Sequence, residues 1–243
     1  MKIYTLGTSH GSTEPGRACS GTLISVNGAL YLFDCGGNVE GKMTDLNLPF
    51  GNLRCAFISH MHEDHAGTLT SIYKRFTVYN HTNSKIQMFL PEECGISAFK
   101  NWVSALHLPT SDSVIFNLTL PEEIYADENV RVCAISTAHI QNGKFPSYAY
   151  VFEAEGKRIL YTGDLNSDFS DYPEAVLREK FDAVISELVH FNPEENLETI
   201  AKSKTDRIIF THIWPEKADT VWSLRDTFPF PIHIANDCDV FEV

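Results

Sequence analysis

The chain has 243 residues, of which 43% are hydrophobic and 21% charged, an ordinary composition for a soluble globular protein with a sizeable core. Its 19 Lys and Arg against 32 Asp and Glu give a net charge of −13, and no cluster of basic residues interrupts this balance. The charge disfavours nucleic acid as a partner, but it does not disfavour a small anionic substrate that metal ions attract.

Short apolar runs and turn signals alternate along the whole chain. Asn27-Gly28 and Glu155-Gly156 each separate two strand-like runs, which predicts two hairpins. The predicted strands are 2–6, 21–26, 29–34, 54–58, 85–90, 130–137, 148–153, 157–162, 181–186, 207–211, 232–235 and 238–242. The predicted helices are 64–75, 92–106, 193–204 and 216–226. Hairpins mixed with βα units predict an α/β (α+β) layered fold, and no linker divides it, so we expect one domain over residues 1–243.

The start of the chain and its cysteines bear on location. The N-terminal MKIYTLGTSHGS lacks the apolar stretch of a signal peptide, and no apolar run reaches membrane-spanning length. The six cysteines are scattered without a CxxC pair, which favours reduced thiols. We therefore predict a cytoplasmic protein with no membrane partner. Whether it forms a homo-oligomer stays open.

The most informative stretch is the HxHxDH sequence formed by His60, His62, Asp64 and His65. It directly follows an apolar strand, and imidazole and carboxylate are ligands that divalent zinc, iron and manganese accept. His60 and His62 are two residues apart, so in an extended turn they point the same way. Asp64 and His65 then turn toward a second metal as the helix begins. A polar loop with chance histidines is the alternative, and it fits this dense pattern poorly.

Three further ligand-type residues stand just past the ends of apolar strands. His139 follows VRVCAIST, Asp164 follows RILYT, and His212 follows RIIFT. Open α/β sheets place their sites at such strand ends. We therefore expect these residues to join the HxHxDH residues in one metal site.

Taken together, these motifs resemble the metallo-β-lactamase superfamily of αββα sandwich hydrolases, closest to its ribonuclease Z and phosphodiesterase branch. The likeness extends over most of the chain. Its motifs are Leu6-Gly7-Thr8 with Pro15-Gly16-Arg17, Phe33-Asp34-Cys35-Gly36, the HxHxDH at 60–65, Tyr161-Thr162-Gly163-Asp164, Phe210-Thr211-His212 and Ala235-Asn236-Asp237. The resemblance implies a four-layer αββα sandwich.

The resemblance also implies the ligand sets of two divalent metal ions. One ion is held by His60, His62 and His139, and the other by Asp64, His65 and His212, with Asp164 bridging the two. Asp34 is expected behind these ligands, where it orients one of them. Diiron redox relatives carry Glu at the position of His62, so this histidine favours zinc and hydrolysis; manganese and iron stay open as alternatives.

The sequence departs from ribonuclease Z in two respects. No basic, glycine- and proline-rich arm for tRNA lies between His65 and His139 or between His139 and Asp164. The His-Glu-Ala-Thr motif reads Ser186-Glu187-Leu188-Val189, so its His is missing, and the later His-Ser-Thr motif is absent. Processing of tRNA is therefore disfavoured.

We predict a phosphodiesterase that acts on a small phosphate ester through a metal-bridging hydroxide. A lactone, thioester or amide hydrolase of the same fold is the main alternative, and a metal-binding module without turnover is a weaker one. Asp64 is expected to orient the nucleophile. Glu187 is a catalytic candidate with an equally good structural explanation, and His190 is a weak candidate to replace the missing family His.

Two residues of the loop after the first strand are candidates for contact with the substrate. Arg17 can bind an anionic group with two hydrogen bonds, and a structural salt bridge explains it equally well. His10 is a weaker candidate, because a histidine in such a loop more often lies on the surface. The substrate itself, the physiological metal and the general acid stay open.

Overall fold

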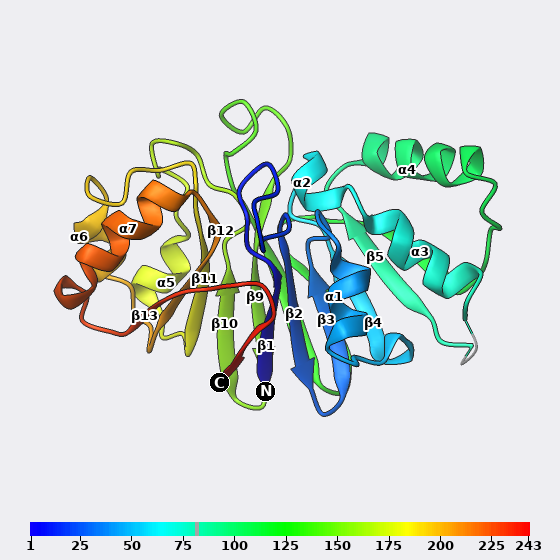
Figure 1. Cartoon of the computed structure of the whole chain (residues 1–243), viewed down its shortest axis with the longest axis horizontal. Helices are drawn as coiled ribbons and strands as arrows, with labels where there is room; N and C mark the ends of the chain where they lie inside the picture. The colour runs from blue at the N-terminus through cyan, green and yellow to red at the C-terminus, as the bar shows by residue number, and fades with distance from the viewer. Residues whose placement is uncertain (81–82) are drawn as a thin grey trace.

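The computed structural model describes residues 1–80 and 83–243 of the chain. Two mixed sheets, each of seven strands in the described part, lie face to face between two groups of helices (Figure 1). The strands of the first sheet, in spatial order, are β14 (Asp239–Glu242), β1 (Lys2–Gly7), β2 (Gly21–Val26), β3 (Ala29–Phe33), β4 (Leu53–Phe57), β5 (Ile86–Leu90) and β6 (Val114–Leu118). Those of the second are β13 (Ile232–Ile234), β12 (Ile208–Ile213), β11 (Ala183–Leu188), β10 (Lys157–Tyr161), β9 (Tyr148–Ala154), β8 (Val130–Ser136) and β7 (Glu123–Ala126).

Each sheet combines antiparallel and parallel pairing. In the first, β14, β1, β2 and β3 are antiparallel neighbours, and β3 to β6 run parallel. In the second, β7 to β10 are antiparallel, and β10 to β13 run parallel. The expected hairpins at Asn27-Gly28 and Glu155-Gly156 are present, with positive φ at all four residues. Parallel strands point their carboxyl ends to one edge, which is where an open α/β sheet carries its site.

Helices cover the outer face of each sheet. The first sheet carries α1 (Val39–Asp45), α2 (Glu63–Ala66), α3 (Leu69–Thr77) and α4 (Glu93–Ala105), and the second carries α5 (Glu174–Arg178), α6 (Leu197–Ala201) and α7 (Pro215–Ser223) (Figure 1). Two short 3₁₀ helices, η1 (Phe50–Asn52) and η2 (Arg225–Thr227), complete the helical elements of the described residues. The order of layers is helix, sheet, sheet, helix, and the predicted αββα sandwich is confirmed.

Three apolar clusters fill the spaces between these layers. The central one joins the inner faces of both sheets through aromatic residues such as Phe33, Phe57 and Tyr150. The second lies under α1, α3 and α4, and the third under α5 to α7. Buried apolar area of this kind supplies most of the drive to fold. It also holds the strand ends, and therefore the residues that follow them, in fixed positions.

Some elements differ from those predicted. The expected helix 64–75 is broken at Gly67-Thr68, because Thr68 donates a backbone hydrogen bond to the carbonyl of Cys35 and leaves the helical path. The expected helix 193–204 is only Leu197–Ala201. Among the strands and α-helices of the described residues, β6, β7, α1 and α5 were not predicted. No helix in the described ranges is both long and apolar enough to cross a bilayer.

Candidate metal centre

The seven predicted ligand residues meet at the carboxyl edge of the strands. They come from the segments after β4, β8 and β10, from the start of α2 and from the end of β12. The residues are His60, His62, Asp64, His65, His139, Asp164 and His212. Their ligand atoms form two groups, each with its members within 4.8 Å of one another, and a third group that also includes His190.

The first group contains three imidazoles around one carboxylate. Nε2 of His60 lies 3.0 Å from Nδ1 of His62, which lies 3.3 Å from Nε2 of His139. Oδ2 of Asp164 is 3.6 Å from Nε2 of His60 and 3.6 Å from Nε2 of His139. Three imidazole nitrogens and a carboxylate oxygen make a donor set that suits zinc.

The second group consists of Asp64, His65 and His212, and Asp164 of the first group lies beside it. Nε2 of His65 lies 3.3 Å from Oδ1 of Asp164 and 3.5 Å from Oδ2 of Asp64. Nε2 of His212 lies 3.4 Å from Oδ2 of Asp164 and 3.8 Å from Oδ2 of Asp64. Asp164 thus stands between the two groups, at the position where the sequence places a bridging ligand.

Two buried polar atoms in this cluster lack a hydrogen-bond partner. They are Nε2 of His65 and Oδ1 of Asp164, and they face each other. Burying such atoms without a partner costs free energy, and native structures contain few of them. A cation between them would satisfy both atoms, so the residues present fit a divalent metal.

The electrostatics of the cluster agree with that fit. Burial lowers the pKa of His60 well below its usual range, so its imidazole is neutral, the form that binds a metal. Burial opposes the charge of Asp164, yet the neighbouring His212 and His65 hold its pKa well below the usual range. Burial also lowers the pKa of His65, but the charges of Asp164 and Asp34 outweigh it and raise that pKa. The negative charge that favours a proton on His65 favours a divalent cation there as well.

The Nδ1 atoms of three ligands are held by neighbours, which leaves Nε2 directed into the cluster. His65 Nδ1 lies 2.8 Å from Oδ2 of Asp34, His212 Nδ1 lies 2.8 Å from Oγ of Ser20, and His139 Nδ1 lies 3.2 Å from the carbonyl of Leu165. These contacts fix the ring orientations before any metal binds.

Asp34 lies behind the cluster, next to His65. Its carboxylate accepts hydrogen bonds from the backbone N–H and the hydroxyl of Ser59 at 2.7 and 2.8 Å, and from the hydroxyl of Tyr161 at 2.7 Å. Its φ of 60° is a conformation that few residues other than glycine adopt. Asp34 therefore ties His65 to the strand ends of both sheets.

Gly36 lies against the backbone of the HxHxDH segment. A Cβ at this position would overlap the backbone carbonyl of Asp64. The N–H of Cys35 donates to the carbonyl of His65 at 2.7 Å, so the two segments run in direct contact. Only glycine permits this close approach of the two backbones. The approach positions Asp64 and His65 next to the other ligand residues.

Glu187 makes the structural contacts that were one of its two predicted explanations, and a catalytic role for it stays a prediction. Its buried carboxylate accepts hydrogen bonds from the backbone N–H groups of Leu165, Val189 and His190 at 2.8 to 2.9 Å. It also lies 3.0 Å from Nδ1 of His190. Glu187 therefore organises the backbone and orients His190, and its carboxylate is fully used by these contacts.

His190, a weak candidate from the sequence, lies beside the ligand cluster. Its Nδ1 is 3.7 Å from Oδ2 of Asp164, and its ring centroid is 4.5 Å from that of His139. Burial lowers its pKa, but the hydrogen bond and charge of Glu187 outweigh this and raise it to about 9. The signal in the sequence was the Glu-x-x-His spacing after a buried strand.

The Arg17 guanidinium makes structural contacts, which were one of its two predicted explanations, and its contact with a substrate stays a prediction. Its guanidinium donates hydrogen bonds to Thr8 Oγ1 and to the carbonyl of Ala235 at 2.7 Å, and to Asn236 Oδ1 at 2.9 Å. These contacts join the loop after β1 to the segment after β13. The guanidinium is occupied by this structural task.

His10 lies at the rim of the cluster. Its Nε2 is 3.2 Å from Glu14, and its ring centroid is 4.6 Å from that of Trp214, two residues after His212. A Cβ on the next residue, Gly11, would be 3.6 Å from Oδ2 of Asp64. The loop that carries His10 therefore borders the site, and contact of His10 with a substrate stays a prediction.

The comparison with family models decides the family. The model described as Anti-Pycsar protein Apyc1 matches residues 1–218. The chain belongs to the Anti-Pycsar protein Apyc1 family. This match includes all seven residues of the ligand cluster and the Glu187–His190 pair.

Other comparisons agree with the fold of this Apyc1 family member. It is 27% identical to ribonuclease Z of Methanocaldococcus jannaschii over 63% of this chain and 47% of that protein. Among solved structures, the metallo-β-lactamase fold protein YhfI from Bacillus subtilis covers the chain to 99%, with 99% of its own length, a TM-score of 0.81 and 19% identity. The short form of human tRNase Z gives a TM-score of 0.77 and 19% identity over 100% of this chain and 99% of that one. The chain has the metallo-β-lactamase fold, and it spans about half the length of the first curated relatives it matches.

Proposed function

We propose that this chain is a binuclear metal-dependent hydrolase that cleaves a small phosphodiester. The observation that carries the proposal is the convergence of seven ligand-type side chains into two groups with Asp164 between them. The likeness to ribonuclease Z sequences supports a metal-dependent hydrolase of phosphodiesters. The histidine-rich donor set, with His62 in the first group, favours zinc as the metal.

The residues assigned to the metals are those that the geometry brings together. His60, His62 and His139 form one site, and Asp64, His65 and His212 form the other. When bound, two divalent ions supply an activated water and neutralise the charge that develops on the phosphate. The Asp64 carboxylate, which is partly open to solvent, also orients the attacking water.

The leaving oxygen needs a proton, and His190 is placed to supply it. Glu187 occupies Nδ1 of His190 and favours the protonated ring. Nε2 has no hydrogen-bond partner among residues 1–80 and 83–243, and the side chain is 29% exposed. We therefore assign to His190 the delivery of a proton from Nε2 to the leaving oxygen, with Glu187 as the residue that orients it.

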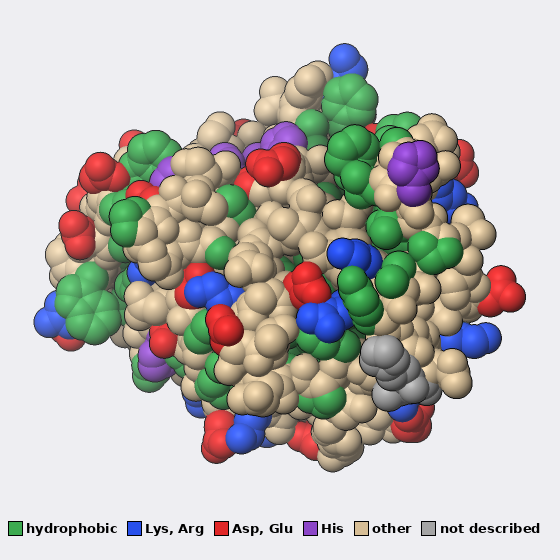
Figure 2. Space-filling view, turned by 45° about the vertical axis from the view of Figure 1, so that its right-hand side comes forward, with side chains coloured by type: hydrophobic (Ala, Val, Ile, Leu, Met, Phe, Trp, Pro, Cys, Tyr) green, Lys and Arg blue, Asp and Glu red, His purple; other side chains and the backbone are tan. Residues whose placement is uncertain are grey.

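The surface supports a small substrate rather than a long nucleic acid. The net charge is −13, and on the face drawn in Figure 2 the Lys and Arg side chains are interspersed with Asp and Glu. Binding to tRNA depends largely on Lys and Arg that neutralise phosphates. Between α3 and β8, the described residues form elements of the first sheet and its helices, followed by β7. They form no projecting arm.

A substrate panel tests the proposal. The zinc-loaded protein is expected to hydrolyse bis(p-nitrophenyl) phosphate and diphenyl phosphate, and to leave precursor tRNA uncut. Elemental analysis should give two metal equivalents per chain. Activity confined to a lactone or a thioester would move the chain to the alternative class, and salt-sensitive cleavage of precursor tRNA at its 3′ trailer would contradict the small-substrate assignment.

A further inference from the structure

The segment that carries His190 is a loop held by side chains rather than by a sheet or a helix. β11 ends at Leu188, and the N–H groups of Val189 and His190 turn back to Oε2 of Glu187 at 2.8 and 2.9 Å. The carbonyl of Leu188 accepts a hydrogen bond from the N–H of Trp214 at 3.2 Å. These contacts satisfy the N–H groups of Val189 and His190 and the carbonyl of Leu188. The carbonyls of the two residues on either side of His190 need another partner.

Lys217 is that partner. Its ammonium donates to the backbone carbonyls of Val189 and of Phe191, the latter at 2.7 Å. These two residues flank His190 directly. Within the residues that the structure describes, neither carbonyl has another hydrogen-bond donor. The Lys217 side chain of α7 thus binds the loop through the residues directly before and after His190.

The position of Lys217 is unfavourable for a lysine that has no such contact. It lies in the first turn of α7, where the helix dipole disfavours a positive charge. Burial lowers its pKa, and the negative charge of Glu187 opposes that shift. The ammonium is therefore partly desolvated and lies near the positive end of the helix dipole, and both effects cost free energy. Its two contacts with carbonyls and the nearby carboxylate of Glu187 offset this cost.

We infer that Lys217 is a positioning residue for His190: by holding the carbonyls of Val189 and Phe191, it keeps the imidazole between Glu187 and Asp164. The inference rests on the proposed function of His190 as the proton donor. The ring of His190 is only partly buried, so the backbone contacts largely determine where it stands. A catalytic group displaced by about 1 Å loses on the order of 10²-fold in rate.

The chain offers a matched control in Lys204. Its Nζ also donates to a backbone carbonyl, that of Arg178, at 2.8 Å, but on the exposed surface away from the ligand cluster. The variants Lys217→Met and Lys204→Met each remove one ammonium and keep an unbranched side chain that is one atom shorter. A difference between them therefore measures what the contact with the His190 loop adds.

The kinetic test uses diphenyl phosphate, whose poor leaving group needs the proton. Lys217→Met is expected to lower kcat by about 10-fold to 100-fold with KM within about twofold, because the substrate still binds the metals. Metal content should stay at that of the parent protein, and Lys204→Met should match the parent in all three quantities. In a His190→Ala background, Lys217→Met should have no further effect on kcat, because the residue it positions is gone.

Hydrogen exchange gives a readout that does not depend on turnover. The amides of Val189 and His190 should exchange about tenfold faster or more in Lys217→Met than in the parent, and unchanged in Lys204→Met. Unchanged exchange, or an equal loss of kcat with and without His190, would overturn the inference. If the parent protein hydrolyses no diester while exchange responds as expected, the proposed function fails and the structural role of Lys217 stands.

Discussion

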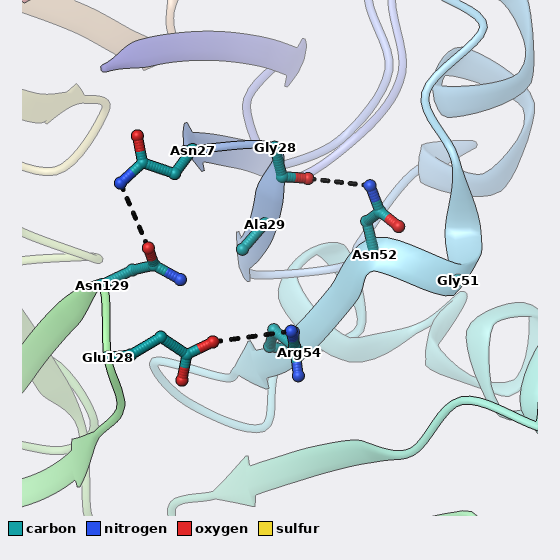
Figure 3. A pocket seen from close by; sticks show the side chains of 8 residues that line it. All are labelled: Asn27, Gly28, Ala29, Gly51, Asn52, Arg54, Glu128 and Asn129. Atoms are coloured by element: carbon teal, nitrogen blue, oxygen red, sulfur yellow. Dashed lines mark hydrogen bonds and ion pairs between the residues drawn. The ribbon is translucent and has the colours of Figure 1, made fainter.

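The two ends of the sheet sandwich both carry clusters of polar side chains, and they differ in how these polar groups are satisfied. At the amino ends of β3, β4 and β8 lies a cavity of about 300 Å³ (Figure 3). Its lining residues are Asn27, Gly28, Ala29, Gly51, Asn52, Arg54, Glu128 and Asn129. They pair with one another: Asn27 with Asn129 at 3.2 Å, the carbonyl of Gly28 with Asn52 at 2.9 Å, and Arg54 with Glu128 at 3.7 Å.

The opposite edge contains buried carboxylates and imidazoles that satisfy one another only in part, because Nε2 of His65 and Oδ1 of Asp164 have no hydrogen-bond partner among the described residues. The side chains of His60, His65 and Asp164 are at most 2% exposed, whereas those of Arg54 and Glu128 are 51% and 69% exposed. An exposed ion pair contributes little, since water competes for both charges. A buried set with unpartnered atoms gains much from a cation. Burial without partners, rather than polarity, therefore distinguishes the metal centre from the cavity at the other end.

The largest effect is expected when Asp164, which lies between the two metal sites, is replaced. Asp164→Ala should abolish hydrolysis, a loss of at least about 10⁴-fold in kcat/KM, because both metal sites lose a ligand. Metal content by elemental analysis should fall for both sites. Glu128→Gln, at the amino edge, should change neither quantity. Two metal equivalents retained in Asp164→Ala would contradict the bridging assignment.

The next largest effect is expected for the His190→Ala variant, which distinguishes a proton donor from a metal ligand at this position. His190→Ala should lower kcat on diphenyl phosphate by about 10² to 10⁴-fold, the usual contribution of general acid catalysis, with metal content unchanged. The loss should be much smaller on bis(p-nitrophenyl) phosphate, because its leaving group departs without a proton. If His190→Ala instead removes a metal equivalent, His190 is a ligand, as its place beside Asp164 and His212 also allows.

A smaller effect, on metal affinity, is expected when Asp34 behind the ligands is replaced. Asp34→Asn removes the charge that faces His65 but keeps the size of the side chain. Metal affinity, measured by competition with a chelator, should fall by about 10 to 100-fold, the usual result for a residue that orients a ligand. An affinity equal to that of the parent would show that Ser59 and the sheet ends hold His65 without Asp34.

The smallest effect on activity is expected at Arg17. Arg17→Ala should lower the free energy of unfolding by about 1–3 kcal/mol, because three hydrogen bonds of a charged group are lost. KM and kcat should stay close to those of the parent, and Arg54→Ala should leave stability nearly unchanged. A raised KM with unchanged unfolding in denaturant would restore Arg17 as a contact to the substrate.

The placement of the ligands was predictable because it follows from local patterns. β2 matches the predicted strand 21–26, and β8 and β9 differ from prediction by one residue at an end. Buried strands read as apolar runs, and a ligand-type residue after such a run must lie at the sheet edge. The convergence of His139 and His212 on the HxHxDH motif was therefore predictable from the sequence. The αββα order was an implication of the resemblance to metallo-β-lactamase fold hydrolases, because the pattern of strands and helices predicts only an α/β (α+β) layered fold.

Features that depend on contacts between residues far apart in the chain could not be predicted from the sequence. Arg17 is held by residues more than 200 positions away, which no local pattern announces. The half-exposed strands β6 and β7 lack the continuous apolar runs of the central strands. His190 was only a weak candidate to replace the missing family His, because the folded loop after β11 is what brings it to Asp164. The cytoplasmic location and the single-domain organisation stay predictions.

The close approach of Gly36 to the Asp64 backbone has a consequence for reading related sequences. A chain could keep all seven histidines and aspartates and still fail to bring Asp64 and His65 to their partners if position 36 carried a side chain. Ligand motifs alone would then classify an inactive paralogue as an enzyme. When homologues are sorted into active and decayed members, the glycine after Asp34-Cys35 deserves the same weight as the ligands themselves.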